Sequence, residues 1–192
     1  MASNLDICNA ALVELGADPI ADFTATKIGR TAKTLYDMEK PRLMRLHPWN
    51  FLKLRGVLGS PLAAPLFDWL YQFELPGDLI RLIQVGKRDY PIDYELVHRA
   101  NGAGGLMTNV TPVPIVYLDG SMAEANWPSW YVDLMTKAML ARLAYAVTNS
   151  RTMAEDAKKA FEDELARCRA MQGSEVLSED LGQPSEYLAV RY

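Results

Sequence analysis

The spacing of apolar residues changes at the segment His47-Pro48-Trp49-Asn50-Phe51. In residues 24–46 apolar side chains recur at intervals of three and four, which is typical of an amphipathic helix. His47 precedes a proline, which biases its backbone away from the helical region and predicts that the helix ends there. Residues 51–119 instead contain short alternating runs, which predict strands. The chain must therefore combine helices with a separate sheet.

Trp49 and Phe51 follow the end of this helix at alternating positions. Such spacing is typical of an outgoing strand whose aromatic side chains anchor it to the helices. We therefore expect Trp49 and Phe51 to be structural anchors that are more than half buried, and Trp127 to be a further anchor. The alternative interpretation is a binding or catalytic site that contains His47 and Trp49.

Two helices are predicted before this segment. Ser3 and Asp6 form a weak version of the capping box for the first helix, which ends before Gly16. The second helix begins near residues 24–26, and Pro41 predicts a kink or a break within it. The apolar stripe of the second helix consists of Ile28, Ala32, Leu35, Glu39 and Leu43.

The middle of the chain reads as an antiparallel sheet whose strands are joined by turns. The predicted strands are Leu52–Val57, Trp69–Leu75, Leu79–Val85, Ile92–Val97 and Val113–Leu118. The glycine-rich segment Asn101–Gly105 predicts a loop. It lacks the Gly-Lys-Ser/Thr ending of a phosphate loop, and strand-like residues follow it.

The last third of the chain returns to helical spacing. One helix, capped by Asn126, is expected to begin at Trp127. A final helix, capped by Thr152 and Glu155, is expected to end at Gly173.

Together these patterns predict an α+β fold. Residues 1–50 and 120–173 would form a helical bundle, and residues 51–119 would form an antiparallel β subdomain inserted into it. Residues 174–192 have no helical or strand period and are expected to form an extended C-terminal tail.

Composition narrows the possible functions. The 192 residues carry a formal net charge of −4, which argues against tight binding to a nucleic-acid backbone. No apolar run approaches the roughly 18 residues of a membrane span, and the N-terminus does not resemble a signal peptide. The two cysteines, Cys8 and Cys168, are expected to be buried free thiols of a chain made in a reducing cytoplasm. Spacing alone leaves a disulfide between them open.

The sequence contains no recognisable catalytic set. His47 and His98 have no second imidazole or cysteine at the spacing of a zinc site. No Gly-x-Ser-x-Gly, Ser-x-x-Lys or Cys-His arrangement is present, and the acidic run 162–164 reads as a solvated helix face. The four tryptophans are expected to be core or interface anchors, because no basic residues interleave with them. We therefore expect a protein that is not an enzyme and that holds no metal or cofactor.

The order of motifs along the chain resembles a known family. The motifs are Asn9–Gly16 followed by Pro19-Ile20, then His47–Phe51, Tyr71–Asp78, Pro114–Tyr117, and Trp127–Tyr145 followed by Thr148-Asn149-Ser150. This order resembles the tail tubular protein A family, the head-to-tail adaptors of tailed bacteriophages. The resemblance covers residues 5–150 and, loosely, the final helix. Each motif alone is weak, and the signal comes from their order in a chain of matching length.

The resemblance implies a structural virion protein that has a helical bundle and an inserted β subdomain. Copies of it, about twelve, would form a closed ring below the portal protein. The ring would continue the channel for double-stranded DNA, which passes without specific binding, and would provide a platform for a tail tube or nozzle protein. The implied location is the head-to-tail interface of the virion, after assembly in the cytoplasm of a bacterial host. No membrane and no cofactor are implied.

The family resemblance does not cover the C-terminal tail. It is acidic up to about residue 186 and then becomes apolar and aromatic. We expect it to be disordered in the free monomer and to dock on a neighbouring subunit or on the portal in the assembly. The candidate contact residues are Tyr187, Leu188, Val190, Arg191 and Tyr192. The alternative is a frayed terminus.

Other functions remain possible at this stage. A tail terminator or completion protein would also form a ring, but it would contact only the tail tube. A small enzyme could assemble its site by oligomerisation, in which case convergent carboxylates would line a pocket. A nucleic-acid-binding regulator is disfavoured, because the chain is acidic and has no basic stripe.

Overall fold

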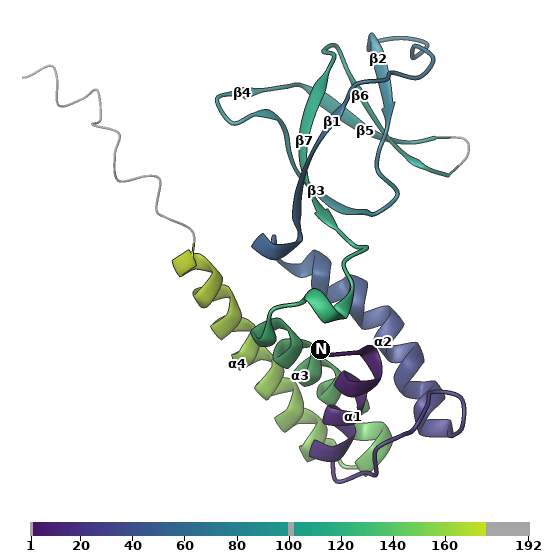
Figure 1. Ribbon diagram of the computed structural model, residues 1–192, viewed down its shortest axis with the longest axis vertical. Coiled ribbons are helices and arrows are strands. Elements are labelled where there is room, and N and C mark those ends of the chain that lie inside the picture. The colour runs from purple at the N-terminus through teal and green to yellow at the C-terminus, as the bar shows by residue number, and fades with distance from the viewer. Residues whose placement is uncertain (1, 100–101, 176–192) are drawn as a thin grey trace, which may run out of the picture.

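A computed structural model describes residues 2–99 and 102–175 (Figure 1). The predicted α+β fold is confirmed: helices from both ends of the chain pack together, and two antiparallel sheets are inserted between them. The α-helices are α1 (Asn4–Glu14), α2 (Lys27–Leu46), α3 (Ser129–Thr148) and α4 (Arg151–Glu175). Two short 3₁₀ helices, η1 (Asn50–Leu52) and η2 (Glu124–Asn126), lie at the two connections to the β subdomain. The predicted contacts of residues 187–192 lie outside the described residues.

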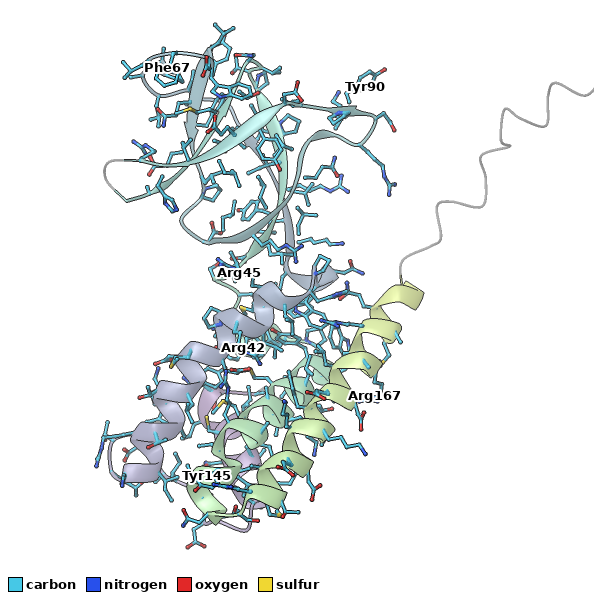
Figure 2. All side chains as sticks on the ribbon, turned by 180° about the vertical axis from the view of Figure 1, so that it is seen from behind. Arg42, Arg45, Phe67, Tyr90, Tyr145 and Arg167 are labelled. Carbon is cyan, nitrogen blue, oxygen red and sulfur yellow. The ribbon has the colours of Figure 1, made fainter. Side chains whose placement is uncertain are left out.

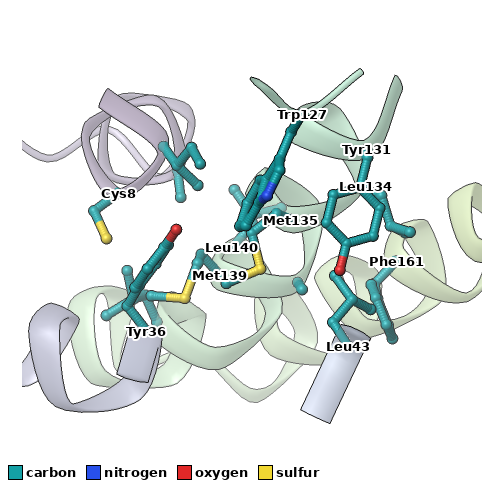
Figure 3. Packing of buried hydrophobic residues seen from close by; sticks show 14 of the residues in the cluster. Cys8, Tyr36, Leu43, Trp127, Tyr131, Leu134, Met135, Met139, Leu140 and Phe161 are labelled. Atoms are coloured by element: carbon teal, nitrogen blue, oxygen red, sulfur yellow. The ribbon is translucent and has the colours of Figure 1, made fainter. Parts of the chain in front are cut away.

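Helix α3 is the centre of the bundle and packs against α1, α2 and α4. Its buried side chains cover more than one face, which is typical of a helix surrounded by others. They are Tyr131, Leu134, Met135, Ala138, Met139, Leu140, Leu143 and Ala144. Figure 3 shows several of them meeting Cys8 of α1, Tyr36 and Leu43 of α2, and Phe161 of α4.

The first two helices follow the sequence prediction closely. Ser3 and Asp6 form a complete capping box, and Gly16 after α1 has a φ of +76°. His47 ends α2 in an extended conformation, as predicted. Pro41 was predicted to kink or break α2, and the break is absent, because α2 continues through it. Tyr36 and Leu43, on either side of Pro41, are both buried in the same core, and this packing holds the two halves in one helix.

The starts of the last two helices differ from the prediction. Asn126 lies in η2 rather than at a cap, and α3 begins two residues after Trp127 with no side-chain cap. At the next junction Asn149 adopts a left-handed conformation with φ +52°, which turns the chain at once. As a result Ser150, not Thr152, caps α4, and its Oγ accepts a hydrogen bond from the backbone N–H of Met153 at 3.3 Å. Helix α4 also continues past Gly173.

The β subdomain contains two antiparallel sheets, whereas the sequence predicted one. The first has the order β1 (Lys53–Leu58), β7 (Val113–Asp119), β3 (Leu79–Lys87), β4 (Tyr90–Pro91). The second has the order β2 (Tyr71–Glu74), β6 (Gly104–Thr108), β5 (Tyr94–His98). The short strand β4 was not predicted. Strand β6 begins inside the segment predicted as a loop; at Gly105 a β-carbon would lie only 3.1 Å from Val97, so glycine permits the close approach of β5.

Two cores hold the molecule together. The larger lies in the bundle and includes Leu52 and Leu118, which stand at the two connections to the β subdomain. The smaller lies in the β subdomain and consists of Phe73, Val85, Leu106, Val113, Ile115 and Tyr117. At the junction the Arg45 guanidinium donates a hydrogen bond to the carbonyl oxygen of Ile80 at 2.9 Å. The β subdomain therefore stands on one end of the bundle (Figure 1). Among the described residues, no helix has both the length and the apolar character that crossing a bilayer requires.

Candidate functional site

The predicted aromatic anchors meet around one residue, Tyr131 of α3. The ring centroids of Trp49, Phe51 and Trp127 lie 5.3, 4.7 and 5.1 Å from that of Tyr131. Trp49 and Trp127 are buried and Phe51 is partly buried, which agrees with their prediction as anchors. The prediction that these residues anchor an outgoing strand was wrong, because Phe51 lies in the 3₁₀ helix η1. This cluster, the aromatic hub, joins the end of α2 to α3.

The aromatic hub packs within the core of the bundle. The indole N–H of Trp49 donates to the carbonyl oxygen of Leu43 at 3.0 Å, so its polar atom is used within the core. His47 packs edge-on against Trp49 with centroids 4.8 Å apart. Burial lowers the pKa of His47, and the nearby cations Arg169, Lys53 and Arg81 lower it further. The histidine therefore sits in a positive environment that favours its neutral form.

Glu39 of α2 forms a buried ion cluster that the sequence prediction did not recognise. Only 1% of its surface is exposed, as expected for a stripe residue, yet it is charged. Arg42 donates to Oε1 from Nε at 2.7 Å and also through Nη2, and Arg142 of α3 donates to Oε2 at 2.8 Å. The spacing of Glu39 and Arg42 could be seen in the sequence, but the pairing of Glu39 with Arg142 of α3 could not. The cluster fastens α2 to α3.

A groove of about 590 Å³ runs beside this ion cluster between α2, α3 and α4. Its charged lining is mixed in sign: Glu39, Arg42, Arg142, Arg151, Glu155, Lys158 and Glu162. Within the described part of the chain, no group of three or more histidine, cysteine or acidic residues is placed to hold a metal ion. Charges of both signs along the groove suit contacts between helices.

A second concave surface lies on the β subdomain and carries charges of one sign. We call it the basic face. It has a volume of about 780 Å³ and is formed by β1, β3 and β7. Its cations are Lys53, Arg55, Lys87 and Arg88, and Val57, Ile83, Pro114 and Val116 form its apolar floor. No carboxylate is among the residues that line it. The alternation of Lys53, Arg55 and Val57 on β1 was a signal for this face, but its extent depends on the pairing with β7 and β3.

The loop 59–70 between β1 and β2 carries three strongly exposed apolar side chains, and we call it the apolar tip. Leu66, Phe67 and Leu70 are 97%, 73% and 63% exposed. The loop is nevertheless attached to the sheets, because the backbone N–H of Leu70 donates to Asn109 at 2.9 Å and the indole N–H of Trp69 donates to a carboxylate at 2.9 Å. Figure 2 shows Phe67 at the end of the molecule opposite Tyr145 of the bundle. Clustered exposed apolar side chains are typical of contact sites.

Both cysteines are buried free thiols, so the disulfide left open by the sequence is not formed. Burial raises the pKa of Cys8 and of Cys168 to about 12 in each case. The contact residues predicted in the C-terminal tail lie outside the described residues.

Comparison with known proteins adds no further constraint. The chain matches no model of a known protein family, and no curated protein is significantly similar to it.

Proposed function

We propose that this chain is a head-to-tail adaptor of a tailed bacteriophage. It would form a ring below the portal that continues the DNA channel and receives a tail tube or nozzle protein. The observation that carries the proposal is the placement of two chemically different surfaces at opposite ends of the molecule. The apolar tip lies at one end, and the charged helical bundle lies at the other.

This arrangement supports a protein that joins two different partners. The bundle contains the larger core and the satisfied ion cluster of Glu39, so it provides a rigid base. In the proposal the tip contacts the tail component, because Leu66, Phe67 and Leu70 are exposed among the described residues and such a contact would bury them. Portal contacts come from the bundle and from the C-terminal residues 187–192. Copies associate head to tail around the axis, since only such an interface closes into a ring.

The proposal is tested by mixing the purified chain with purified portal rings encoded by the same genome and imaging the product by electron microscopy. We expect a closed, rotationally symmetric ring of this chain on one end of the portal. Isolated copies without rotational symmetry would contradict the proposal. Binding to the tail tube but not to the portal would identify a tail terminator instead.

The role of the apolar tip can be tested separately. The variant Phe67→Ser should still form the ring on the portal but should fail to add the tail component. The matched control is Tyr90→Ser, because Tyr90 is similarly exposed in the same subdomain but lies in β4, outside the tip. Equal tail addition by both variants would show that the tip is not the contact.

A further inference from the structure

The basic face has an unusual composition for a protein with a net charge of −4. Lys53 and Arg55 of β1 and Lys87 of β3 are exposed, and no carboxylate lines the surface among the described residues. Its apolar floor includes two exposed side chains, Val57 and Ile83. Like charges on a concave surface raise its positive potential, so an anionic group nearby is favoured. Because the floor of the basic face is apolar, it favours a binding partner that carries apolar side chains as well as negative charge.

The end of α4 lies beside this face. Gln172 of α4 donates a hydrogen bond to the carbonyl oxygen of Pro48 at 3.0 Å, and Lys53 follows Pro48 closely in the sequence. Arg169 of α4 and Lys53 both act on the pKa of His47, so positive charge continues from α4 to the start of β1. Figure 1 shows the last turn of α4 close to η1, at the base of the β subdomain. The residues that follow α4 therefore start next to the basic face.

Those residues have the complementary chemistry. Residues 176–192 contain Glu179, Asp180 and Glu186, and their only basic side chain is Arg191. The final residues add the apolar and aromatic side chains Tyr187, Leu188, Val190 and Tyr192. A nucleic-acid backbone would match the charge of the face but would leave its apolar floor without a partner. An acidic segment with an apolar end matches both the positive charge and the apolar floor of the basic face.

We propose that the C-terminal segment 179–192 docks on the basic face of its own chain in the free monomer. The acidic side chains pair with Lys53, Arg55 and Lys87, and the segment from Tyr187 onward covers the apolar floor. Composition alone predicts that this segment is disordered. The basic face, which lies beside the end of α4, offers the segment a binding site. The inference does not depend on the adaptor proposal, because it concerns one chain.

The geometry permits this contact. From the end of α4 to Tyr187 an extended chain reaches on the order of 40 Å at about 3.3 Å per residue. A strand as short as β1 spans only about 20 Å, so the segment can cross the whole face. A short tether of this length gives an effective concentration in the millimolar range, so weak contacts within one chain suffice. In a ring the same segment would be free to exchange to a neighbouring subunit or to the portal.

The proposal is tested on the full-length chain with a carbodiimide, which joins a lysine amine to a carboxylate only when the two are in contact. The reaction is run on a mixture of unlabelled and ¹⁵N-labelled chains and analysed by mass spectrometry. We expect links from Lys53 and Lys87 to Glu179, Asp180 or Glu186, with both peptides from the same isotope. The control lysines are Lys27 and Lys158, which are exposed on the bundle and should be linked to these carboxylates far less often.

Variants of the exposed charges sharpen the test. The double variant Arg55→Glu/Lys87→Glu should lower the yield of Lys53 links about tenfold, which corresponds to a modest loss of contact free energy. Circular dichroism should show an unchanged fold, because both side chains are exposed. Adding Glu179→Lys and Glu186→Lys to this variant should restore cross-linking at position 87.

Three results would overturn the proposal. The first is a wild-type chain whose lysines at 53 and 87 form no links to the segment. The second is a set of links that join differently labelled chains, which would assign the segment to a neighbouring copy. The third is tight binding of a short DNA duplex at physiological salt that the Arg55→Glu/Lys87→Glu variant loses, which would assign the face to phosphates.

Discussion

The helical bundle and the β subdomain differ in how completely they bury their apolar surface. The bundle encloses a continuous core around α3 and pairs its buried carboxylate with two arginines. The β subdomain has a smaller core and leaves Leu66, Phe67, Val57 and Tyr90 largely exposed. Exposed apolar side chains of this kind are typical of contact surfaces, which the C-terminal segment or another molecule would cover. The comparison places the larger core in the bundle and supports the proposal that the β subdomain carries the contact surfaces.

The strongest test of this comparison removes Trp49, a fully buried member of the aromatic hub. Trp49→Ala should lower the free energy of unfolding by roughly 3–5 kcal/mol, because it leaves a large cavity against Tyr131 and Trp130. For a chain of this size that corresponds to a fall in Tm of roughly 10 °C, measured by calorimetry. The control Trp69→Ala removes a partly exposed tryptophan from the β subdomain and should cost about 1 kcal/mol. Equal losses would contradict the division between the two regions.

The next largest effect is expected at the buried ion cluster. Glu39→Ala removes the charge-assisted hydrogen bonds that Arg42 and Arg142 donate to the buried carboxylate and should cost about 3 kcal/mol in urea unfolding. The control Glu14→Ala breaks a more exposed pair with Lys137 and should cost less than about 1 kcal/mol. If Glu39→Ala were as stable as the wild type, the cluster would not fasten α2 to α3.

A smaller effect, with the opposite sign, is expected at Tyr131. Its hydroxyl is buried and has no hydrogen-bond partner among the described residues. Tyr131→Phe should therefore raise stability by about 1 kcal/mol, because the cost of burying an unpaired hydroxyl is removed. Tyr36→Phe is the matched control: the Tyr36 hydroxyl donates to Glu124 at 3.1 Å, so its loss should lower stability by about 1 kcal/mol. A destabilised Tyr131→Phe would mean that the hydroxyl has a partner.

The smallest effect on stability is expected at the apolar tip. Replacing Leu66, Phe67 and Leu70 by serine should change the free energy of unfolding by less than about 0.5 kcal/mol, because these side chains pack little in the monomer. The same variant should remain soluble at higher protein concentration, measured by light scattering. A loss of several kcal/mol would show that the tip belongs to the core of the β subdomain.

Several features could be predicted from sequence because they depend on neighbouring residues. The capping box of Ser3 and Asp6 and the helix end at His47 are of this kind. Where a distant contact competes with a local signal, the prediction fails. Pro41 favours a break, but the burial of Tyr36 and Leu43 in one core outweighs it. A prediction also fails where two local signals compete. Thr152 offers a good cap, but the turn at Asn149 makes Ser150 the first residue able to act as one.

The order of helical and alternating spacing along the chain was enough to determine the fold class, because a hydrophobic period selects helix or strand locally. The burial of Trp49 could also be predicted, since a large aromatic side chain next to a helix end gains free energy by packing against the helices. Tertiary structure alone decided the division of the strands into two sheets, the pairing of Glu39 with Arg142, and the assembly of the basic face. These depend on strand register and on contacts between residues far apart in the chain, and no local pattern encodes such contacts.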